Sequence, residues 1–168
     1  MSQSNSQKPA FNETMQIAIV VRDLNTTMRN YTDNYGIGPW QVHQFKPEDV
    51  KSWEELGQTA EPSTRFATTM VGSVQWELIQ PLDDQSIYAR FLAEKGEGVH
   101  HIAVATHDYD TLMQAEQNRG KALVLKCALG GKYEGLEVAY LGSEAELGVT
   151  LEVFNGLPSA VRDEFEQS

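Results

Sequence analysis

The sequence lacks several features that would assign a protein to a class at once. It has 1 cysteine in 168 residues, so no disulfide can form within the chain. No apolar run approaches the roughly 20 residues that cross a membrane. The first residues also lack the basic and then apolar pattern of a signal peptide. These absences predict a cytoplasmic protein with no membrane partner.

Basic residues are scarce. The chain has 13 Lys and Arg against 24 Asp and Glu, which gives a formal net charge of −11 and a pI near 4.7. Because a nucleic-acid surface needs a stripe of Lys and Arg to neutralise phosphates, we expect no nucleic-acid partner. With 40% hydrophobic and 22% charged residues, the composition is that of an ordinary globular protein, and particular residues must indicate the function.

Two halves of the chain have the same order of expected elements. Residues 1–12 are polar and are expected to form a disordered lead. Residues 13–82 form a first module, 83–98 a linking helix and 99–156 a second module, and 157–168 are left as a C-terminal tail. Each module reads as strand, helix and three further strands, so we predict an α+β fold of two βαβββ modules.

The expected elements follow apolar periodicity and the turn residues between them. Gly72 and Ser73 form a two-residue hairpin connection. The expected strands are Met15–Val21, Trp40–Phe45, Thr64–Val71, Val74–Gln80, His100–Thr106, Ala122–Leu129, Leu136–Leu141 and Val149–Phe154. The expected helices are Asn25–Tyr35, Ser86–Lys95 and Tyr109–Asn118.

An internal duplication relates the modules. The stretch 16–23, QIAIVVRD, aligns without a gap to 101–108, HIAVATHD. The stretch 74–78, VQWEL, aligns likewise to 149–153, VTLEV. The duplication makes Gln16 equivalent to His101 and Glu77 equivalent to Glu152.

These four equivalent residues are the candidate metal ligands. A carboxylate amid strand residues such as Trp, Leu and Val is costly to bury unless it is paired or bound to a metal. Strand alternation places Gln75 and Glu77 on a face that can line a cavity, with Trp76 on the other. A single Glu on one strand is more simply interpreted as a solvated residue. Two glutamates at equivalent positions of the two modules favour a shared role.

The adjacent histidines are expected to face opposite ways, so only one of them can join the glutamates. The alignment with Gln16 selects His101, and His43, His100 and His107 are interpreted as structural. One imidazole nitrogen and three oxygens suit a six-coordinate divalent ion such as Mn²⁺, Co²⁺, Ni²⁺ or Zn²⁺.

The motifs resemble those of the vicinal oxygen chelate superfamily, which comprises glyoxalases, bleomycin resistance proteins and dioxygenases. The resemblance covers about residues 14–155 and rests on QIAIVVRDL at 16–24, WELIQPL at 76–82, VHHIA at 99–103 and LEV at 151–153. It is nearest to methylmalonyl-CoA epimerase-like members. It implies two curved sheets that cup a metal, which binds substrate oxygens and stabilises an enolate.

Particular positions depart from these epimerases. Their first ligand is usually His, whereas the set Gln16, Glu77, His101 and Glu152 is similar to that of the human-type lactoylglutathione lyase. The stretch 64–70 offers no carboxylate, although the epimerases carry a second catalytic Glu on that strand. The set also does not match the two histidines and one carboxylate of the iron dioxygenases. Two-base epimerisation and ring cleavage therefore fit poorly.

Two further stretches have alternative interpretations. The segment Lys46–Pro62, which contains Trp53, is either a lid or specificity element or a solvated connecting helix. Trp40 either lines a substrate cavity or fills the core.

The resulting prediction is a divalent-metal-dependent isomerase, epimerase or lyase acting on a small carbonyl substrate, either an acyl thioester or an oxo or hydroxy acid. The metal, Zn, Ni, Co or Mn, would stabilise an enolate. The resemblance suggests Glu152 as the base and a homodimer as the assembly. The alternatives are a lactoylglutathione lyase-type glyoxalase and a non-catalytic protein that binds or sequesters a small molecule in the same fold.

Overall fold

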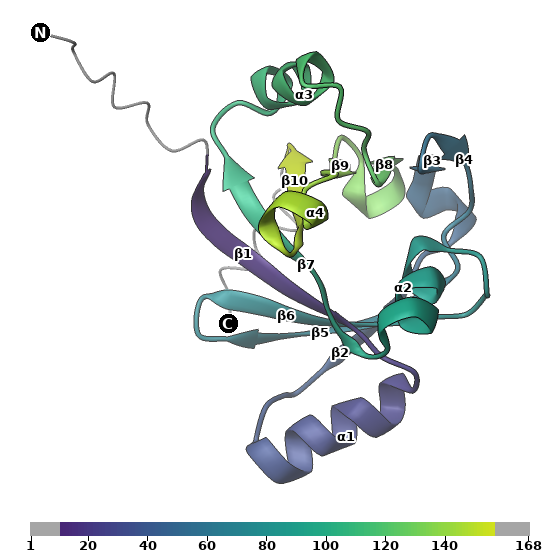
Figure 1. The fold of residues 1–168 in the computed structure, drawn as a ribbon. Helices are drawn as coiled ribbons and strands as arrows, with labels where there is room; N and C mark the ends of the chain where they lie inside the picture. The colour runs from purple at the N-terminus through teal and green to yellow at the C-terminus, as the bar shows by residue number, and fades with distance from the viewer. Residues whose placement is uncertain (1–10, 157–168) are drawn as a thin grey trace, which may run out of the picture.

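A computed structural model describes residues 11–156 and contains one mixed ten-stranded sheet that curves around a central space (Figure 1). The strand order is β2-β5-β6-β1-β7-β10-β9-β8-β3-β4. Residues 1–10 of the expected disordered lead, and the expected C-terminal tail at 157–168, lie outside the described residues. Phe11 and Asn12, which were assigned to the lead, belong to the first strand. None of the helices within residues 11–156 is long and apolar enough to cross a membrane.

The two modules contribute mirrored halves of the sheet, which confirms the α+β class. The first module comprises β1 (Phe11–Val20), α1 (Leu24–Tyr35), β2 (Gln41–Gln44), β5 (Thr64–Val71) and β6 (Val74–Pro81). The second comprises β7 (Gly98–Thr106), α3 (Tyr109–Asn118), β8 (Leu125–Leu129), β9 (Glu137–Tyr140), α4 (Glu144–Leu147) and β10 (Thr150–Asn155). Helix α2 (Ile87–Lys95) connects them, and the antiparallel pair β1–β7 joins their sheets.

Matching registers support the duplication. In the parallel pair β1–β6, Ala18 lies opposite Glu77, and in the parallel pair β7–β10, Ala103 lies opposite Glu152. The helices α1 and α3 also begin alike, because Asp23 and Asp108 each accept a backbone hydrogen bond three residues ahead, at 2.6 and 3.0 Å. Residues that align in the sequence therefore occupy equivalent places.

The apolar residues pack on both faces of the sheet. Val21, Leu24 and Leu78 form a buried cluster under α1, and a separate cluster lies under α3. Trp76 makes an edge contact with Tyr31 of α1, with ring centroids 5.9 Å apart, which confirms that its side chain points away from Glu77. Trp40 packs on the same α1 cluster, so its core interpretation fits. The opposite, concave face is left for the site.

The segment Lys46–Pro62 forms strands instead of a connecting helix. It contains a short 3-10 turn η1 (Pro47–Asp49) and the strands β3 (Val50–Glu55) and β4 (Gln58–Thr59). Strand β3 pairs antiparallel with β8, so a first-module segment extends the sheet of the second module. The helical interpretation was wrong because alternation buries Trp53, which is 5% exposed, between exposed neighbours.

A glycine pair lets this inserted hairpin approach the second module. Gly130 donates its backbone N–H to the Asp49 carbonyl at 2.8 Å, and a Cβ at Gly130 would lie 2.9 Å from the carbonyl oxygen of Glu48. Gly131 has a φ of 57°. A side chain at Gly130 would therefore push the hairpin away from η2 (Gly131–Tyr133).

We expect Gly130→Ala to lower the free energy of unfolding by about 1–3 kcal/mol, because the added methyl group meets backbone that cannot move freely. Urea denaturation monitored by circular dichroism measures the change. Gly98→Ala is the matched control, since a Cβ there meets nothing within 4 Å. Equal stability of the two variants would show that the contact between η1 and η2 is not tight.

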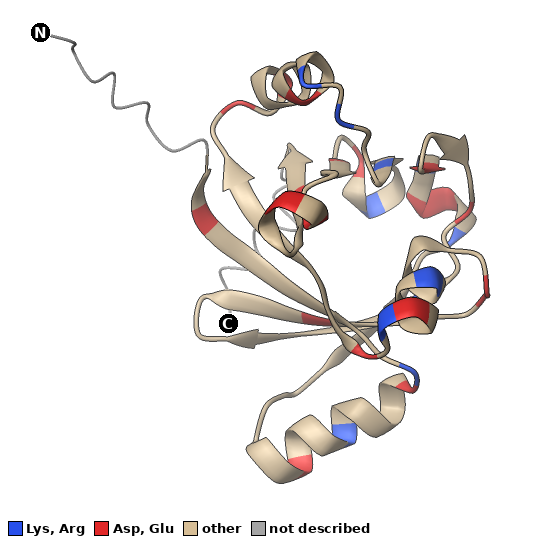
Figure 2. Cartoon of the chain, viewed as in Figure 1, with Lys and Arg blue, Asp and Glu red and all other residues tan. Residues whose placement is uncertain are grey.

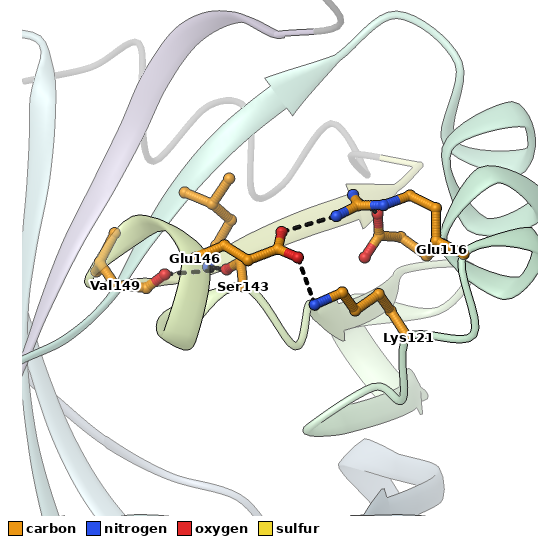
Figure 3. Close-up of polar contacts among 7 residues, drawn as sticks. Glu116, Lys121, Ser143, Glu146 and Val149 are labelled. Carbon is orange, nitrogen blue, oxygen red and sulfur yellow. Dashed lines mark hydrogen bonds and ion pairs between the residues drawn. The ribbon is translucent and has the colours of Figure 1, made fainter.

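Helix α4 lies between β9 and β10 in the chain, and polar contacts fix it (Figure 3). Glu146 pairs with Arg119 at 2.7 Å and with Lys121 at 2.5 Å. The Ser143 hydroxyl donates to the carbonyl of Val149 at 2.9 Å. The ion pairs are partly exposed, so each contributes little to stability and they mainly orient α4 against the end of α3.

Candidate functional site

A cavity of about 130 Å³ opens on the concave face of the sheet. One part of its wall is polar and the other part is apolar and largely aromatic. The polar part contains Gln16, His43, Thr64, Thr68, Gln75, Glu77, Tyr88, Tyr140 and Glu152. The apolar part contains Phe45, Trp53, Phe66, Ile79, Leu125, Cys127, Leu129, Tyr133, Leu136, Val138 and Phe154. The modules of a single chain therefore build the cavity together.

Gln16 and Glu77 meet at the polar end. The Gln16 side-chain amide donates to Glu77 Oε2 at 2.5 Å and to Gln75 Oε1 at 2.7 Å. Gln75 and Glu77 line the cavity, as strand alternation predicts. We did not assign Gln75 to the site from the sequence, although its place two residues before Glu77 was the available signal. Two hydrogen bonds hold Gln16 in place.

His101 and Glu152 form the second pair. Their side chains are almost fully buried, and His101 Nε2 lies 3.1 Å from Glu152 Oε2. The two groups are not aligned as a hydrogen bond, and neither atom has a hydrogen-bond partner within residues 11–156. Buried polar atoms without partners are costly, so this pair has unused capacity to bind a ligand.

Burial sets the protonation of these groups. Desolvation, and then the charge of Glu152, raise the pKa of Glu77 to about 8, opposed by the hydrogen bond from Gln16. Desolvation raises the pKa of Glu152 to about 8 and lowers the pKa of His101 to about 3. At neutral pH the His101 imidazole is therefore neutral, with a ring nitrogen able to act as an acceptor.

His100 does not face away from His101, which corrects the sequence-based expectation. Their Nδ1 atoms lie 3.0 Å apart, and both rings contact Tyr140. The register between β1 and β7 shifts here, since Ala18 pairs with His101 and Ile19 with Val99. This β-bulge at His100 breaks the two-residue alternation on which the expectation relied.

A buried pair of tyrosines completes the polar end. The hydroxyls of Tyr88, on α2, and Tyr140, on β9, lie 2.8 Å apart. Desolvation raises the pKa of both well above the usual value, so both stay protonated. Only one hydroxyl hydrogen is used within the pair, and within residues 11–156 the other has no side-chain acceptor. No spacing or motif in the sequence indicates this pair.

The four predicted ligands form two pairs, Gln16 with Glu77 and His101 with Glu152. No three His, Cys, Asp or Glu side chains within residues 11–156 are close enough to hold one metal ion. His101 and Glu152 nevertheless fit, because ligand atoms at about 2.1 Å from a metal and at right angles lie about 3.0 Å apart. To bind a metal, the Glu77 carboxylate would have to give up the hydrogen bond that it accepts from Gln16. The donors therefore suit a divalent ion, with His101 and Glu152 already placed.

The sequence model of one protein family, the glyoxalase/bleomycin resistance protein/dioxygenase superfamily, matches residues 15–140 of this chain. The chain belongs to this superfamily. Its sequence is 29% identical over 128 residues to the uncharacterized protein YqjC of Bacillus subtilis (strain 168), covering 74% of this chain and 91% of that protein.

Solved structures of methylmalonyl-CoA epimerases have the same fold. The Mycobacterium tuberculosis enzyme superposes with a TM-score of 0.67 at 20% identity and covers 93% of this chain and 95% of its own. A Streptomyces coelicolor epimerase variant in complex with 2-nitronate-propionyl-CoA gives a TM-score of 0.61 at 21% identity, over 86% of this chain and 96% of that one. At these identities the superpositions establish the shared fold.

Proposed function

We propose that the protein is a divalent-metal-dependent isomerase, epimerase or lyase that moves a proton next to the carbonyl group of a small substrate. The observation that carries this proposal is the buried pair His101 Nε2 and Glu152 Oε2, which are 3.1 Å apart and have no hydrogen-bond partner. The epimerase fold of the structural neighbours supports the same reaction class.

Glu152 is the proposed base. Gln16 holds the other glutamate, Glu77, whereas no such hydrogen bond holds Oε2 of Glu152. Because an ion bound at that oxygen lowers its basicity, Glu152 would act as the base when the substrate displaces it from the ion. The carboxylate removes a proton from the carbon beside the carbonyl and returns it to the same or an adjacent carbon. Because the proton that is removed is also returned, the step accounts for all atoms of an epimerisation or an isomerisation.

Other groups would bind the carbonyl oxygen; among them Gln16 and Glu77 line the cavity, whereas the fully buried His101 does not. Gln16, Glu77, His101 and Glu152 would hold a Zn, Ni, Co or Mn ion, which when bound supplies stabilisation of the negative charge that develops on that oxygen. The free hydroxyl hydrogen of the Tyr88–Tyr140 pair donates a hydrogen bond into the same space. The apolar wall excludes water from the reacting groups.

Turnover in D₂O tests this proposal. The substrates with the closest analogies are methylmalonyl-CoA, from the structural neighbours, and the hemithioacetal of methylglyoxal and glutathione, from the ligand set of lactoylglutathione lyase-type glyoxalases. We expect deuterium at the abstracted position of a substrate, detected by mass spectrometry. Protein that holds a metal but exchanges no proton in a broader panel of acyl thioesters and oxo or hydroxy acids would contradict the proposal.

A non-catalytic binding protein is the second candidate, because the apolar wall covers most of the cavity. Elemental analysis of freshly purified protein distinguishes it from the first. About one tightly bound divalent ion per chain favours the enzyme, and protein that neither retains nor takes up a metal favours simple binding. The predicted homodimer remains a proposal that light scattering tests.

We expect His101→Ala to lower the divalent-metal content of the protein to near the background level, because it removes the one proposed nitrogen ligand. His100→Ala should weaken metal affinity only about 10-fold to 100-fold, since His100 contacts the His101 ring without being a proposed ligand. His107→Ala, at an exposed position, is the control. Equal losses in the His101 and His107 variants would contradict the assignment of His101.

A further inference from the structure

The apolar end of the cavity is built around one aromatic ring. The centroid of Phe45 lies 5.2 Å from that of Phe66, 5.9 Å from that of Trp53 and 6.4 Å from that of Tyr133. Such edge and tilted contacts are favourable arrangements for aromatic side chains. All four rings also line the cavity. An apolar group bound in the cavity would therefore meet aromatic surface.

This aromatic wall comes from segments that are distant in the sequence. Phe45 follows β2 and Phe66 lies on β5 of the first module, whereas Tyr133 ends η2 of the second. Trp53 lies on the inserted strand β3, and its indole N–H donates to Glu55 at 2.9 Å. That bond orients the indole and satisfies its only donor, so its ring can face an apolar ligand without an unpaired polar atom.

The cavity has no fixed positive charge among the described residues. Two glutamates line it and, when ionised, would offset the charge of the proposed divalent ion. No Lys or Arg lines the cavity: β1, β6 and β10 contain none (Figure 2), and Lys51, Arg65 and Lys126, on the lining strands β3, β5 and β8, are not among the lining residues. Lys132 Nζ lies 4.6 Å from the ring centre of Tyr133 but does not line the cavity. A buried anion without a positive partner is costly, so this wall disfavours carboxylates and phosphates.

We propose that the substrate is an uncharged ketone or aldehyde whose carbonyl lies at the Glu77 and Glu152 end and whose aromatic or similarly bulky apolar group lies against Phe45, Phe66 and Tyr133. This inference rests on the proposed function and narrows its substrate class. The cavity volume of about 130 Å³ is comparable with the roughly 150 Å³ of an apolar cavity that accepts a benzene ring. An acyl group with a free carboxylate, such as that of methylmalonyl-CoA, fits this wall poorly.

Four small probes separate the contributions of ring and charge. 2-Hydroxyacetophenone has a ring and no charge, hydroxyacetone has neither, phenylglyoxylate has both, and pyruvate has only the charge. Isothermal titration calorimetry on the full chain as purified gives their dissociation constants. We expect 2-hydroxyacetophenone to bind at least about tenfold more tightly than each of the other three. Equal binding of hydroxyacetone, or tighter binding of phenylglyoxylate, pyruvate or methylmalonyl-CoA, overturns the inference.

Variants of the wall locate the binding. Tyr133→Ala and the milder Phe45→Leu should each weaken binding of 2-hydroxyacetophenone about fivefold to tenfold and leave hydroxyacetone unchanged. Tyr35→Ala is the control, because that aromatic side chain is 75% exposed on α1 and outside the cavity. Circular dichroism confirms that each variant is folded. Unchanged affinity in both folded wall variants overturns the inference.

This binding test does not depend on turnover. If 2-hydroxyacetophenone binds as expected but no substrate exchanges a proton in D₂O, the proposed reaction fails and the substrate-class inference stands. If methylmalonyl-CoA exchanges its proton and the uncharged ring compound does not bind, the inference fails and the proposed reaction stands.

Discussion

Glu152→Gln is expected to lower solvent proton exchange and turnover at least about 100-fold while the protein keeps a substantial fraction of its metal. The amide retains an oxygen that can serve as a ligand, but it cannot accept the substrate proton. The side chain is 5% exposed and its Oε2 has no hydrogen-bond partner, so the substitution breaks no such bond at that oxygen. Exchange in D₂O followed by mass spectrometry, with metal content measured on the same sample, checks both outcomes.

Glu77→Gln is the matched control, because Glu77 occupies the equivalent position on β6. Its carboxylate is held by the Gln16 amide at 2.5 Å, so we expect this variant to lose metal affinity more than it loses the chemical step. Metal added in excess should therefore restore much of its activity. If the metal-loaded Glu152→Gln protein exchanges at the wild-type rate, the base is Glu77 or the cavity-lining His43 instead.

Repetition made the fold predictable from the sequence and indicated four candidate site residues. The alignment of 16–23 with 101–108 fixes which strands are equivalent, and the common registers of Glu77 opposite Ala18 and Glu152 opposite Ala103 follow from it. Alternation alone then places Glu77 in the cavity and Trp76 under α1. Neither step needs the packing of distant side chains, which explains why both can be made before the structure is known.

Features that break local periodicity could not be predicted in this way. The bulge at His100 depends on how β7 pairs with β1, and the pairing of β3 with β8 joins segments more than sixty positions apart. The tyrosine pair likewise joins Tyr88 of α2 to Tyr140 of β9, which are distant in the sequence, so no sequence spacing signals it. Most residues of the apolar wall were therefore missed, whereas three of the four candidate ligands, Gln16, Glu77 and Glu152, line the cavity.

The stability of the metal-free protein is expected to fall between pH 6.5 and 8. Burial raises the pKa of Glu77 and of Glu152 to about 8 from an ordinary value of 4.5, so the folded state keeps protons that the unfolded state releases. Stability is then lost as the pH rises towards 8, by on the order of 1–2 kcal/mol per carboxyl above pH 6.5. His100 and His101, with pKa values lowered to about 3, act in the opposite direction below pH 6.5 and add nothing above it.

A bound divalent ion should reverse this trend. The ion binds carboxylates and not carboxylic acids, so its affinity for the folded state rises over the same pH range in which the metal-free protein weakens. Urea unfolding midpoints at pH 6.5, 7.2 and 8, measured in EDTA and in excess Mn²⁺, should therefore diverge as the pH increases. The double variant Glu77→Gln, Glu152→Gln should show a flat profile in EDTA and little response to Mn²⁺. Parallel profiles of the wild type in EDTA and Mn²⁺ would mean that the ion does not bind through these carboxylates, because only their deprotonation couples metal affinity to pH in this interval.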